Sequence, residues 1–299
     1  MTNLRLRALL LILVSSTCYG GIKSLQDSST AVALIRCDDI GMCHTVNMAA
    51  KQVMETGLPV SFSVMVACPW YQEAVTLLKQ HPEVSVGVHL TLNAEWKQYR
   101  WGPVAGRSAV PSLVDSVGYF FPSRATFFAN KPQLNEIEKE LRSQMERALH
   151  SGLKIDYVDY HMGTAVDRPE LRVIVEKLAK EYGLAVSRYF GETDVEGVYS
   201  SPPSSKLDTL LLRTKSLRMG TINLMVFHIG MQTPEMNALE DLNSFGLREM
   251  SKHRESELNA LTSPQFRALL EAEHVQLKTY KSLVKESGLN SMKRPTLKD

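Results

Sequence analysis

The feature that most constrains the fold is a series of short, nearly continuous apolar runs rich in β-branched residues. Runs of this length are typical of strands that are covered on both faces, as in a parallel sheet. Helical patterns lie between them, and this alternation predicts an α/β fold. The predicted strands begin at Ala31, Val60, Val84, Ile155, Leu184, Ile222 and Val275.

The clearest helical patterns separate these runs. Apolar residues recur at helical spacing from Val46 to Met54, where Gly57 ends the pattern, and again over 134–148. Further helices are predicted over 169–182 and 264–273, and a last one after residue 279. About seven strands in about 250 residues favour a closed or partly closed, TIM-like (β/α) barrel in a single domain. An open doubly wound sheet is the alternative, although no GxGxxG follows a strand.

Composition indicates a globular protein and gives no sign of a nucleic-acid partner. The 299 residues are 44% hydrophobic and 22% charged, with a net charge of +2, which is ordinary for a globular protein. No Lys/Arg block is present, so we expect no nucleic-acid partner. Residues 94–131 and 190–218 are poor in pattern and too long for plain connections, and we expect them to form active-site loops or covers.

The N-terminus has the layout of a secretory signal. Arg5 and Arg7 precede an apolar stretch of roughly ten residues, and small or polar residues follow up to Gly20. Since a bilayer span takes about twenty apolar residues, no stable span is expected after cleavage. A short anchor or a leading helix is the alternative. The predicted parts are a signal peptide (1–20), a linker (21–30), a barrel domain (31–290) and a flexible tail (291–299), in a periplasmic or secreted protein.

Three cysteines remain after such a cleavage. Cys37 and Cys68 adjoin apolar runs and are predicted to be buried as small hydrophobic residues. A bridge between Cys37 and Cys43 would strain the loop that carries two aspartates, so no disulfide is predicted. A cysteine metal site is not predicted, because the sequence contains no CxxC pair.

Polar side chains stand at the C-terminal ends of several predicted strands. In a parallel barrel these ends share one rim, where active sites are built. We therefore expect the side chains to converge in space, although they are far apart in the sequence. They are Asp38 with Asp39, His89, Asp159 with His161, and His228.

Two histidines and a carboxylate are a common ligand set for one divalent metal ion with open coordination positions. We predict Asp39, His89 and His161 as the ligands and Asp38 as a general base. A cation would also explain why two carboxylates stand together. Neighbouring strand residues point to opposite faces, so the two aspartates need not do the same work. Magnesium or zinc is the first choice for the ion.

Each assignment has a structural alternative. Asp38 or Asp39 could cap the following helix. His89 could be a core histidine bonded to the backbone. Asp159 shares a strand face with His161 and could either orient that imidazole or cap a loop.

Five stretches resemble the YdjC-like carbohydrate deacetylases (the ChbG/HpnK group). Their order and spacing match from about Ala31 to Leu283, nearly the whole chain after the signal. The stretches are RCDDIG, GVHLTLN, DYVDYHMGT, LMVFHIG and RESELNALTSPQFRALL.

The resemblance implies a deformed (β/α) barrel that removes acetyl groups from N-acetylated sugars or oligosaccharides with one divalent metal ion. It places the metal ligands at Asp39, His89 and His161 and the base at Asp38. It also implies a functional histidine at His228, for which we predict the role of proton donor. A homodimer is kept as a further prediction.

Two other functions stay open. A different metal-dependent hydrolase, such as a phosphoesterase, would be expected to carry Lys/Arg clamps near these clusters, and none is visible. A non-catalytic sugar-binding relative would be expected to lose Asp38 or His228, and both are present.

Two features have no single interpretation. The aromatic residues Trp96, Tyr99 and Trp101 could form a platform for a sugar or a small apolar core under their loop. Arg254 could contact the site or make a surface ion pair.

Overall fold

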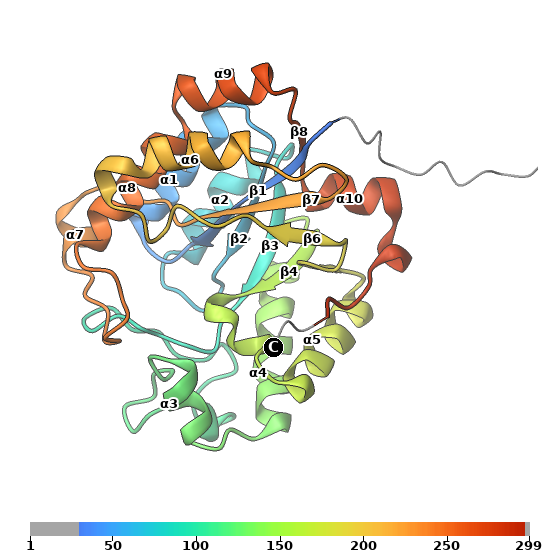
Figure 1. Ribbon diagram of the computed structural model, residues 1–299. Coiled ribbons are helices and arrows are strands. Elements are labelled where there is room, and N and C mark those ends of the chain that lie inside the picture. The colour runs from blue at the N-terminus through green and yellow to red at the C-terminus, as the bar shows by residue number, and fades with distance from the viewer. Residues whose placement is uncertain (1–29, 297–299) are drawn as a thin grey trace, which may run out of the picture.

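The computed structural model describes residues 30–296 (Figure 1). The predicted signal peptide and most of the predicted linker lie outside the described residues, as do the last three residues of the chain. No helix in the described part has the length and apolar character needed to cross a membrane.

One curled sheet of eight strands forms the centre of the molecule. The named strands pair in parallel, in the order β5-β4-β3-β2-β1-β7-β6, and β8 pairs with the start of β1. The strands are β1 (Val32–Ile40), β2 (Val60–Val64), β3 (Ser85–Leu90), β4 (Tyr157–Tyr160), β5 (Ala185–Val186), β6 (Glu192–Asp194), β7 (Ile222–Phe227) and β8 (Gln276–Lys278).

The predicted deformed barrel is confirmed. All of the predicted strands are present, and the two strands that end the order, β5 and β6, are joined by residues 187–191 alone. β6 was not predicted, because a strand of 3 residues is too short to show a pattern.

Helices cover the outside of the sheet (Figure 1). The predicted helices correspond to α1 (His44–Glu55), α4 (Leu134–His150), α5 (Pro169–Tyr182), α9 (Pro264–Ala272) and α10 (Tyr280–Ser287). The sequence did not predict α2 (Tyr71–Lys79), α3 (Arg124–Ala129), α6 (Lys206–Lys215), α7 (Pro234–Asn237) and α8 (Met250–Leu261). On α8 the buried face includes Ser251, Arg254 and Glu257, so the apolar spacing of a helix is missing there.

The main apolar core lies between the sheet and these helices. Alternate β1 residues, among them Ile35 and Cys37, pack into it together with helix residues such as Val46. Cys37 and Cys68 are buried, as predicted, and Cys43 is buried too; all three are free.

The inside of the barrel is filled differently. Leu34, Leu224 and the rings of Tyr157 and Tyr280 belong to a separate apolar cluster, and the two ring centroids lie 4.1 Å apart. The Tyr157 ring lies against Gly87, where a Cβ atom would come within 2.4 Å of it. This layer fills the barrel near the N-terminal ends of the strands, so the functional rim lies at their C-terminal ends.

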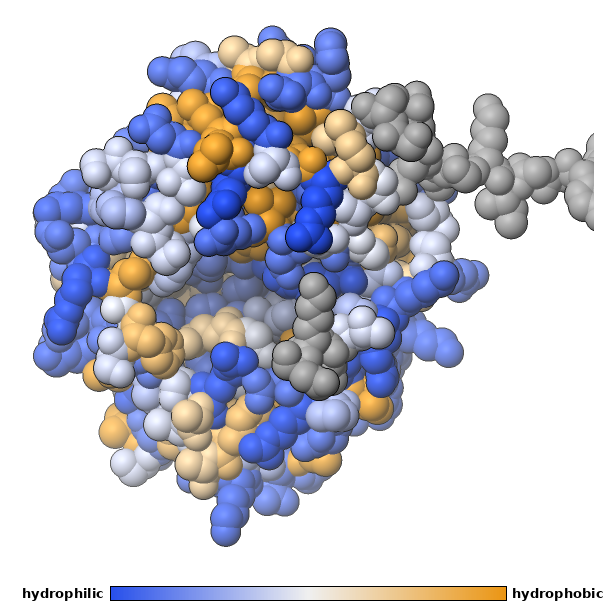
Figure 2. Space-filling model, in the orientation of Figure 1, coloured by the Kyte–Doolittle hydropathy of each residue, from blue (hydrophilic) through white to orange (hydrophobic). Residues whose placement is uncertain are grey.

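Two long connections meet near that rim. The Lys97 amide donates to the Glu240 carbonyl at 2.8 Å, and the Leu242 amide donates to the Glu95 carbonyl at 2.8 Å. Figure 2 shows a recess across this face of the molecule. Trp96 and Trp101 are buried in the main core, which supports the packing alternative for both.

The C-terminal segment contacts the domain beyond the point where a tail was predicted. The Lys293 amide donates to the Tyr189 carbonyl at 2.8 Å, and Arg294 Nε donates to Glu176 at 2.7 Å.

Candidate functional site

The end of β1 brings two neighbouring carboxylates into one buried site. Pairing with β2 becomes irregular there, and Asp39 has a left-handed φ of 67°, which is uncommon for a residue other than glycine. Simple strand alternation would separate Asp38 from Asp39, but each lies within reach of His89. The helix-cap alternative is wrong, because α1 begins after Cys43 and no side chain caps it.

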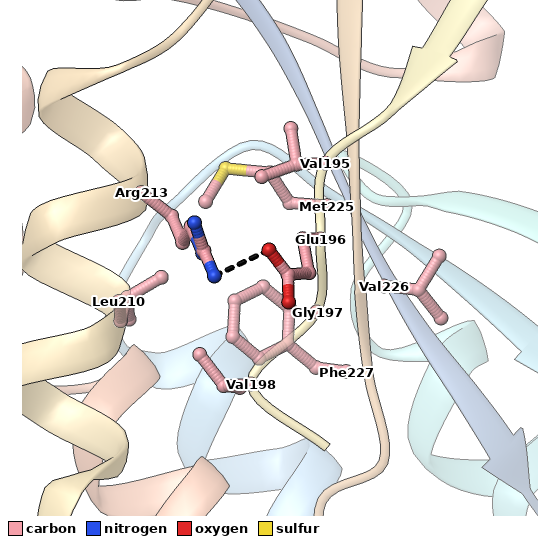
Figure 3. Close-up of a pocket in the computed structure, with 9 residues that line it drawn as sticks. All are labelled: Val195, Glu196, Gly197, Val198, Leu210, Arg213, Met225, Val226 and Phe227. Carbon is pink, nitrogen blue, oxygen red and sulfur yellow. Dashed lines mark ion pairs between the residues drawn. The ribbon is translucent and has the colours of Figure 1, made fainter. Parts of the chain in front are cut away.

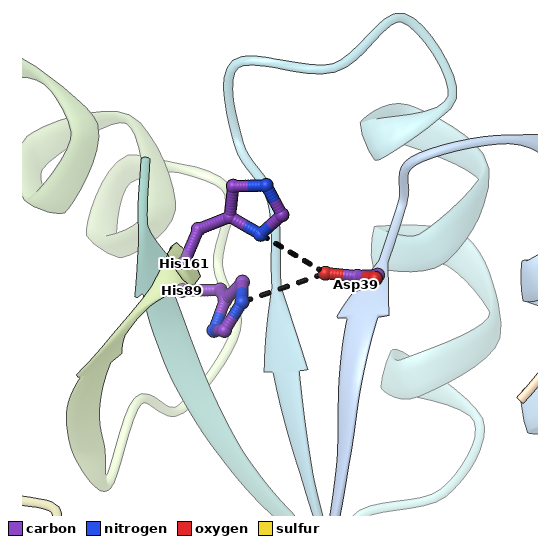
Figure 4. A group of neighbouring side chains, drawn as sticks. All are labelled: Asp39, His89 and His161. Carbon is purple, nitrogen blue, oxygen red and sulfur yellow. Dashed lines mark ion pairs between the residues drawn. The ribbon is translucent and has the colours of Figure 1, made fainter. Parts of the chain in front are cut away.

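Asp39, His89 and His161 converge on one point (Figure 4). Oδ1 of Asp39 lies 3.5 Å from Nε2 of His89 and 3.3 Å from Nδ1 of His161. The three candidate ligand atoms lie within 4.8 Å of one another, and all three residues are buried. Within residues 30–296, this Asp39 oxygen has no hydrogen-bond partner. The donor set and the unpartnered oxygen therefore fit a divalent metal ion.

In each of the two histidines, the ring nitrogen that faces away from Asp39 contacts a further carboxylate. Asp159 Oδ2 lies 2.9 Å from Nδ1 of His89, and Glu95 Oε2 lies 2.9 Å from Nε2 of His161. Such contacts fix which ring nitrogen faces a metal ion. The idea that Asp159 orients His161 is wrong, because Asp159 pairs with His89 across β3 and β4. Glu95 was missed, since it lies in a connection without a sequence pattern.

Each aspartate has its own buried arginine. Nε and Nη2 of Arg36 donate to the two oxygens of Asp38, both at 2.7 Å. Nη2 of Arg254 donates to Oδ2 of Asp39 at 2.6 Å, so Arg254 belongs to the site and not to a surface ion pair. Arg36 was missed, although a residue two positions before Asp38 points to the same strand face.

The arginines keep both carboxylates ionised. Burial alone would raise the pKa of Asp38, but the positive charges of Arg36 and His89 outweigh it and lower that pKa to about 2. Burial likewise opposes ionisation of Asp39. The charge of Arg254 and the two nearby imidazoles, His161 and His89, nevertheless hold the Asp39 pKa well below its ordinary value.

The same carboxylates act on the two imidazoles in the opposite direction. Burial lowers the pKa of His89, but Asp159 and Asp38 outweigh it and raise that pKa to about 10. Burial also lowers the pKa of His161, and Glu95 and Asp39 raise it to about 9. When only protein groups surround them, both imidazoles are therefore protonated on both ring nitrogens, and positively charged, at neutral pH.

The buried charges of the site are two positive charges short of balance. Four carboxylates and two guanidinium groups lie in or directly behind it, all of them buried. A buried charge without a partner is costly, so two further positive charges are required. One divalent ion would supply both charges if the two imidazoles are neutral. Without an ion, one additional proton on each imidazole would supply them. The groups counted are Asp38, Asp39, Glu95, Asp159, Arg36 and Arg254.

His228 lies on the opposite side of this site, directly after β7. Cys37 pairs with Phe227 in the register of β1 and β7, so His228 follows at the level of Asp38 on the side of β1 away from β3 and β4. Its amide donates to Glu257 at 2.7 Å, and Glu257 lies 3.1 Å from Lys206 Nζ. Its ring meets Tyr199 edge-on at 5.0 Å. His228 belongs to neither group of candidate metal ligands among the described residues.

A small pocket between α6 and β7 is separate from this site (Figure 3). It is lined by residues 195–198 and 225–227, and the ion pair of Glu196 with Arg213 crosses it. Its cavity volume of about 10 Å³ has room for roughly one water molecule, so it is not a substrate site.

Comparison with known proteins gives one consistent family. The model of the family described as YdjC-like protein matches residues 32–272. A carbohydrate deacetylase of Thermus thermophilus is 30% identical over 267 residues, which cover 81% of this chain and 90% of that protein. One of Vibrio cholerae is 28% identical, with 84% of this chain and 96% of that protein covered.

Other relatives match over a shorter length or in fold alone. A carbohydrate deacetylase of Brevibacillus brevis is 34% identical over 153 residues, which span 51% of this chain and 57% of that protein. A crystal structure from Enterococcus faecalis, named for cellobiose-phosphate cleavage, has a TM-score of 0.70 at 22% identity. That comparison covers 85% of this chain and 99% of the other, and it shows that the fold is shared.

Proposed function

The chain belongs to the YdjC-like protein family, and we propose that it is a metal-dependent hydrolase that removes acetyl groups from N-acetylated sugars or oligosaccharides. The observation that carries this proposal is the buried convergence of Asp39, His89 and His161 at the strand ends. The relatives named as carbohydrate deacetylases support the choice of substrate.

Asp39 Oδ1, His89 Nε2 and His161 Nδ1 would hold the metal ion, for which magnesium or zinc is the first choice. When bound, a divalent ion supplies Lewis-acid polarisation of the acetyl carbonyl and of a nearby water. Asp159 and Glu95 keep the two ligand nitrogens turned toward it.

Asp38 is the proposed general base. Arg36 occupies one lone pair on each of its oxygens and holds it ionised, which leaves other lone pairs free to accept a proton from a water molecule. A carboxylate with a pKa of about 2 is a weak base, so it would take that proton only from a water that a bound divalent ion has made more acidic. It would then give the proton up readily as the carbon–nitrogen bond breaks.

His228 is the proposed proton donor to that amine. Its backbone is fixed by Glu257, whereas its Nδ1 is buried without a hydrogen-bond partner in the described part of the chain. A substrate group can supply the missing partner. β7 lies on the opposite side of β1 from β3 and β4, which supports a proton donor there on the other side of the reacting bond.

The direct test is acetate release from a panel of N-acetylated sugars and oligosaccharides after chelation and after addition of Mg²⁺ or Zn²⁺. We expect release only with metal and none from Asp39→Ala. Release from the chelated protein at the full rate would refute metal dependence. Binding of the sugars without acetate release would favour a non-catalytic relative, and phosphate release from phosphoesters would favour a phosphoesterase.

We also propose that the protein is exported. The order of charged, apolar and small residues over 1–20 supports export. N-terminal sequencing of the protein from a bacterial host should give a mature start near Gly21 in the periplasmic fraction. A full-length chain confined to the cytoplasm would contradict export.

A further inference from the structure

A second group of candidate metal ligands lies beside the proposed metal site. Asp38, His89 and Asp159 also offer ligand atoms within 4.8 Å of one another, and all three are buried. His89 belongs to both groups. The proposed function uses only the first group as a metal site, so the second needs its own account.

A guanidinium group already lies between the carboxylates of this second group. Nε of Arg36 lies 2.7 Å from Oδ1 of Asp38 and 3.2 Å from Oδ2 of Asp159. The Arg36 side chain is 3% exposed. A metal ion bound through these two oxygens would therefore compete with Arg36.

The inside of the barrel holds Arg36 in that place. Its Nη1 donates to Ser187 Oγ at 2.7 Å, and the hydroxyls of Ser187 and Tyr280 lie 2.6 Å apart. Tyr280 in turn stacks on Tyr157. Arg36 thus has partners on both sides, and its guanidinium group cannot turn away from Asp38 without breaking several buried hydrogen bonds.

We propose that Arg36 takes the place of a second metal ion and so limits this centre to one. The inference rests on the proposed function, because it presupposes an ion held by Asp39, His89 and His161. The charges support it: with Arg36 present one divalent ion balances the site, and without Arg36 a negative charge is left that a further cation can neutralise. Arg36 is a positioning residue that acts on the reaction through Asp38 and Asp159.

The test compares Arg36→Gln, which loses the charge, with Arg36→Lys, which keeps it. Each full-length protein is stripped with a chelator and equilibrated with Mn²⁺, and the bound ions per chain are counted by elemental analysis. We expect one ion in the wild type and in Arg36→Lys, and two in Arg36→Gln. The Mn²⁺ electron paramagnetic resonance spectrum should show an isolated ion in the first two proteins and a coupled pair in the third.

A matched control restores the charge balance in another way. The double variant Arg36→Gln/Asp38→Asn removes one charge of each sign together with one carboxylate of the second group, and it should return to one ion. One ion at wild-type affinity in Arg36→Gln, or two ions in Arg36→Lys, would overturn the inference.

If Arg36→Gln folds only with Mn²⁺, the ions needed per chain are counted by circular dichroism during titration. Two support the inference, whereas one, or no folding at any Mn²⁺ concentration, contradicts it. A wild type that binds no ion would instead refute the proposed function, so the two failures are distinguishable.

Discussion

The two sides of the site differ in how far their buried nitrogen atoms already have partners. On the β3–β4 side, both ring nitrogens of His89 and of His161 face a carboxylate, so neither histidine has an open nitrogen, although Asp159 Oδ1 has no hydrogen-bond partner among the described residues. On the β7–α8 side, Nδ1 of His228 and Nε and Nη1 of Arg254 are buried without hydrogen-bond partners in the described residues. A buried polar group left unpartnered costs on the order of 1–3 kcal/mol, so the second side retains capacity for a ligand.

This difference separates two tasks. The β3–β4 side is preorganised for an ion, because its donors are already aimed by partners of their own. The β7–α8 side fixes its backbone through Glu257 and Lys206 but leaves side-chain donors open. Substitutions on the first side should therefore change metal affinity, whereas substitutions on the second should change turnover with the metal retained.

The largest effect is expected from Asp39→Ala or His89→Ala. Either change removes a proposed ligand, so metal retention and acetate release should both be lost while the circular dichroism spectrum stays near that of the wild type. Elemental analysis and the acetate assay measure the two losses. The exposed His150 provides a matched control, and His150→Ala should change neither. Full metal content in Asp39→Ala would remove the ligand assignment.

Next is Asp38→Asn, which keeps the shape of the side chain but removes its basicity. We expect kcat to fall about 100-fold or more, the usual scale for a lost general base, with metal content unchanged. Steady-state kinetics and elemental analysis on one preparation decide this. An unchanged kcat would mean that Asp38 only pairs with Arg36.

A change of similar or smaller size is expected from His228→Gln, because a proton donor is lost from the open side. We expect a decrease in kcat on the order of 100-fold or less and a metal dissociation constant equal to that of the wild type. Isothermal titration calorimetry with the metal tests the second part. Weaker metal binding in this variant would break the division between the two sides.

Glu95→Gln and Asp159→Asn should weaken metal binding about 10-fold or somewhat more, the usual cost of losing a carboxylate behind a ligating histidine. Calorimetry on the chelated proteins measures this. The exposed Glu240 serves as a control, since Glu240→Gln should bind metal as the wild type does. If Glu95→Gln and Asp159→Asn both bind metal with wild-type affinity, these carboxylates do not preorganise the two histidines for the ion.

The smallest effect concerns the stability of the chelated protein as the pH rises. The pKa values of His89 and His161, about 10 and about 9, lie above the ordinary value of 6.5. Their contribution to stability is therefore complete below pH 6.5 and is lost as the pH rises through about 9 and 10. Urea unfolding should show a falling midpoint over this range for the chelated protein and a smaller fall with metal bound. Equal pH dependence in both forms would contradict the pKa shifts.

Much of the site could be predicted from the sequence, because a single rule of parallel barrels brings strand-end residues together. That rule predicts Asp39, His89 and His161 as neighbours, and the three side chains do converge. It could not identify Glu95, whose position depends on the path of an irregular connection. Nor did it place Arg254, because the buried face of α8 is polar and gives no helical pattern.

Arg36 illustrates a different limit. It stands within an apolar run, and the sequence does not say which groups it meets across the barrel. The contacts with Asp38 and Ser187 depend on the curvature of the sheet, which brings β1 and the end of β5 within reach of one side chain. The fold class thus follows from the pattern of apolar runs, whereas the charge network requires the packed barrel.

The central claim is that one divalent ion is held by Asp39, His89 and His161. Crystals grown with Zn²⁺ and measured on both sides of the zinc absorption edge test it directly. The anomalous difference map should show one peak, about 2.0–2.2 Å from Asp39 Oδ1, His89 Nε2 and His161 Nδ1. A map without density at that point, or with zinc bound by Asp38 and Asp159 instead, would contradict the claim.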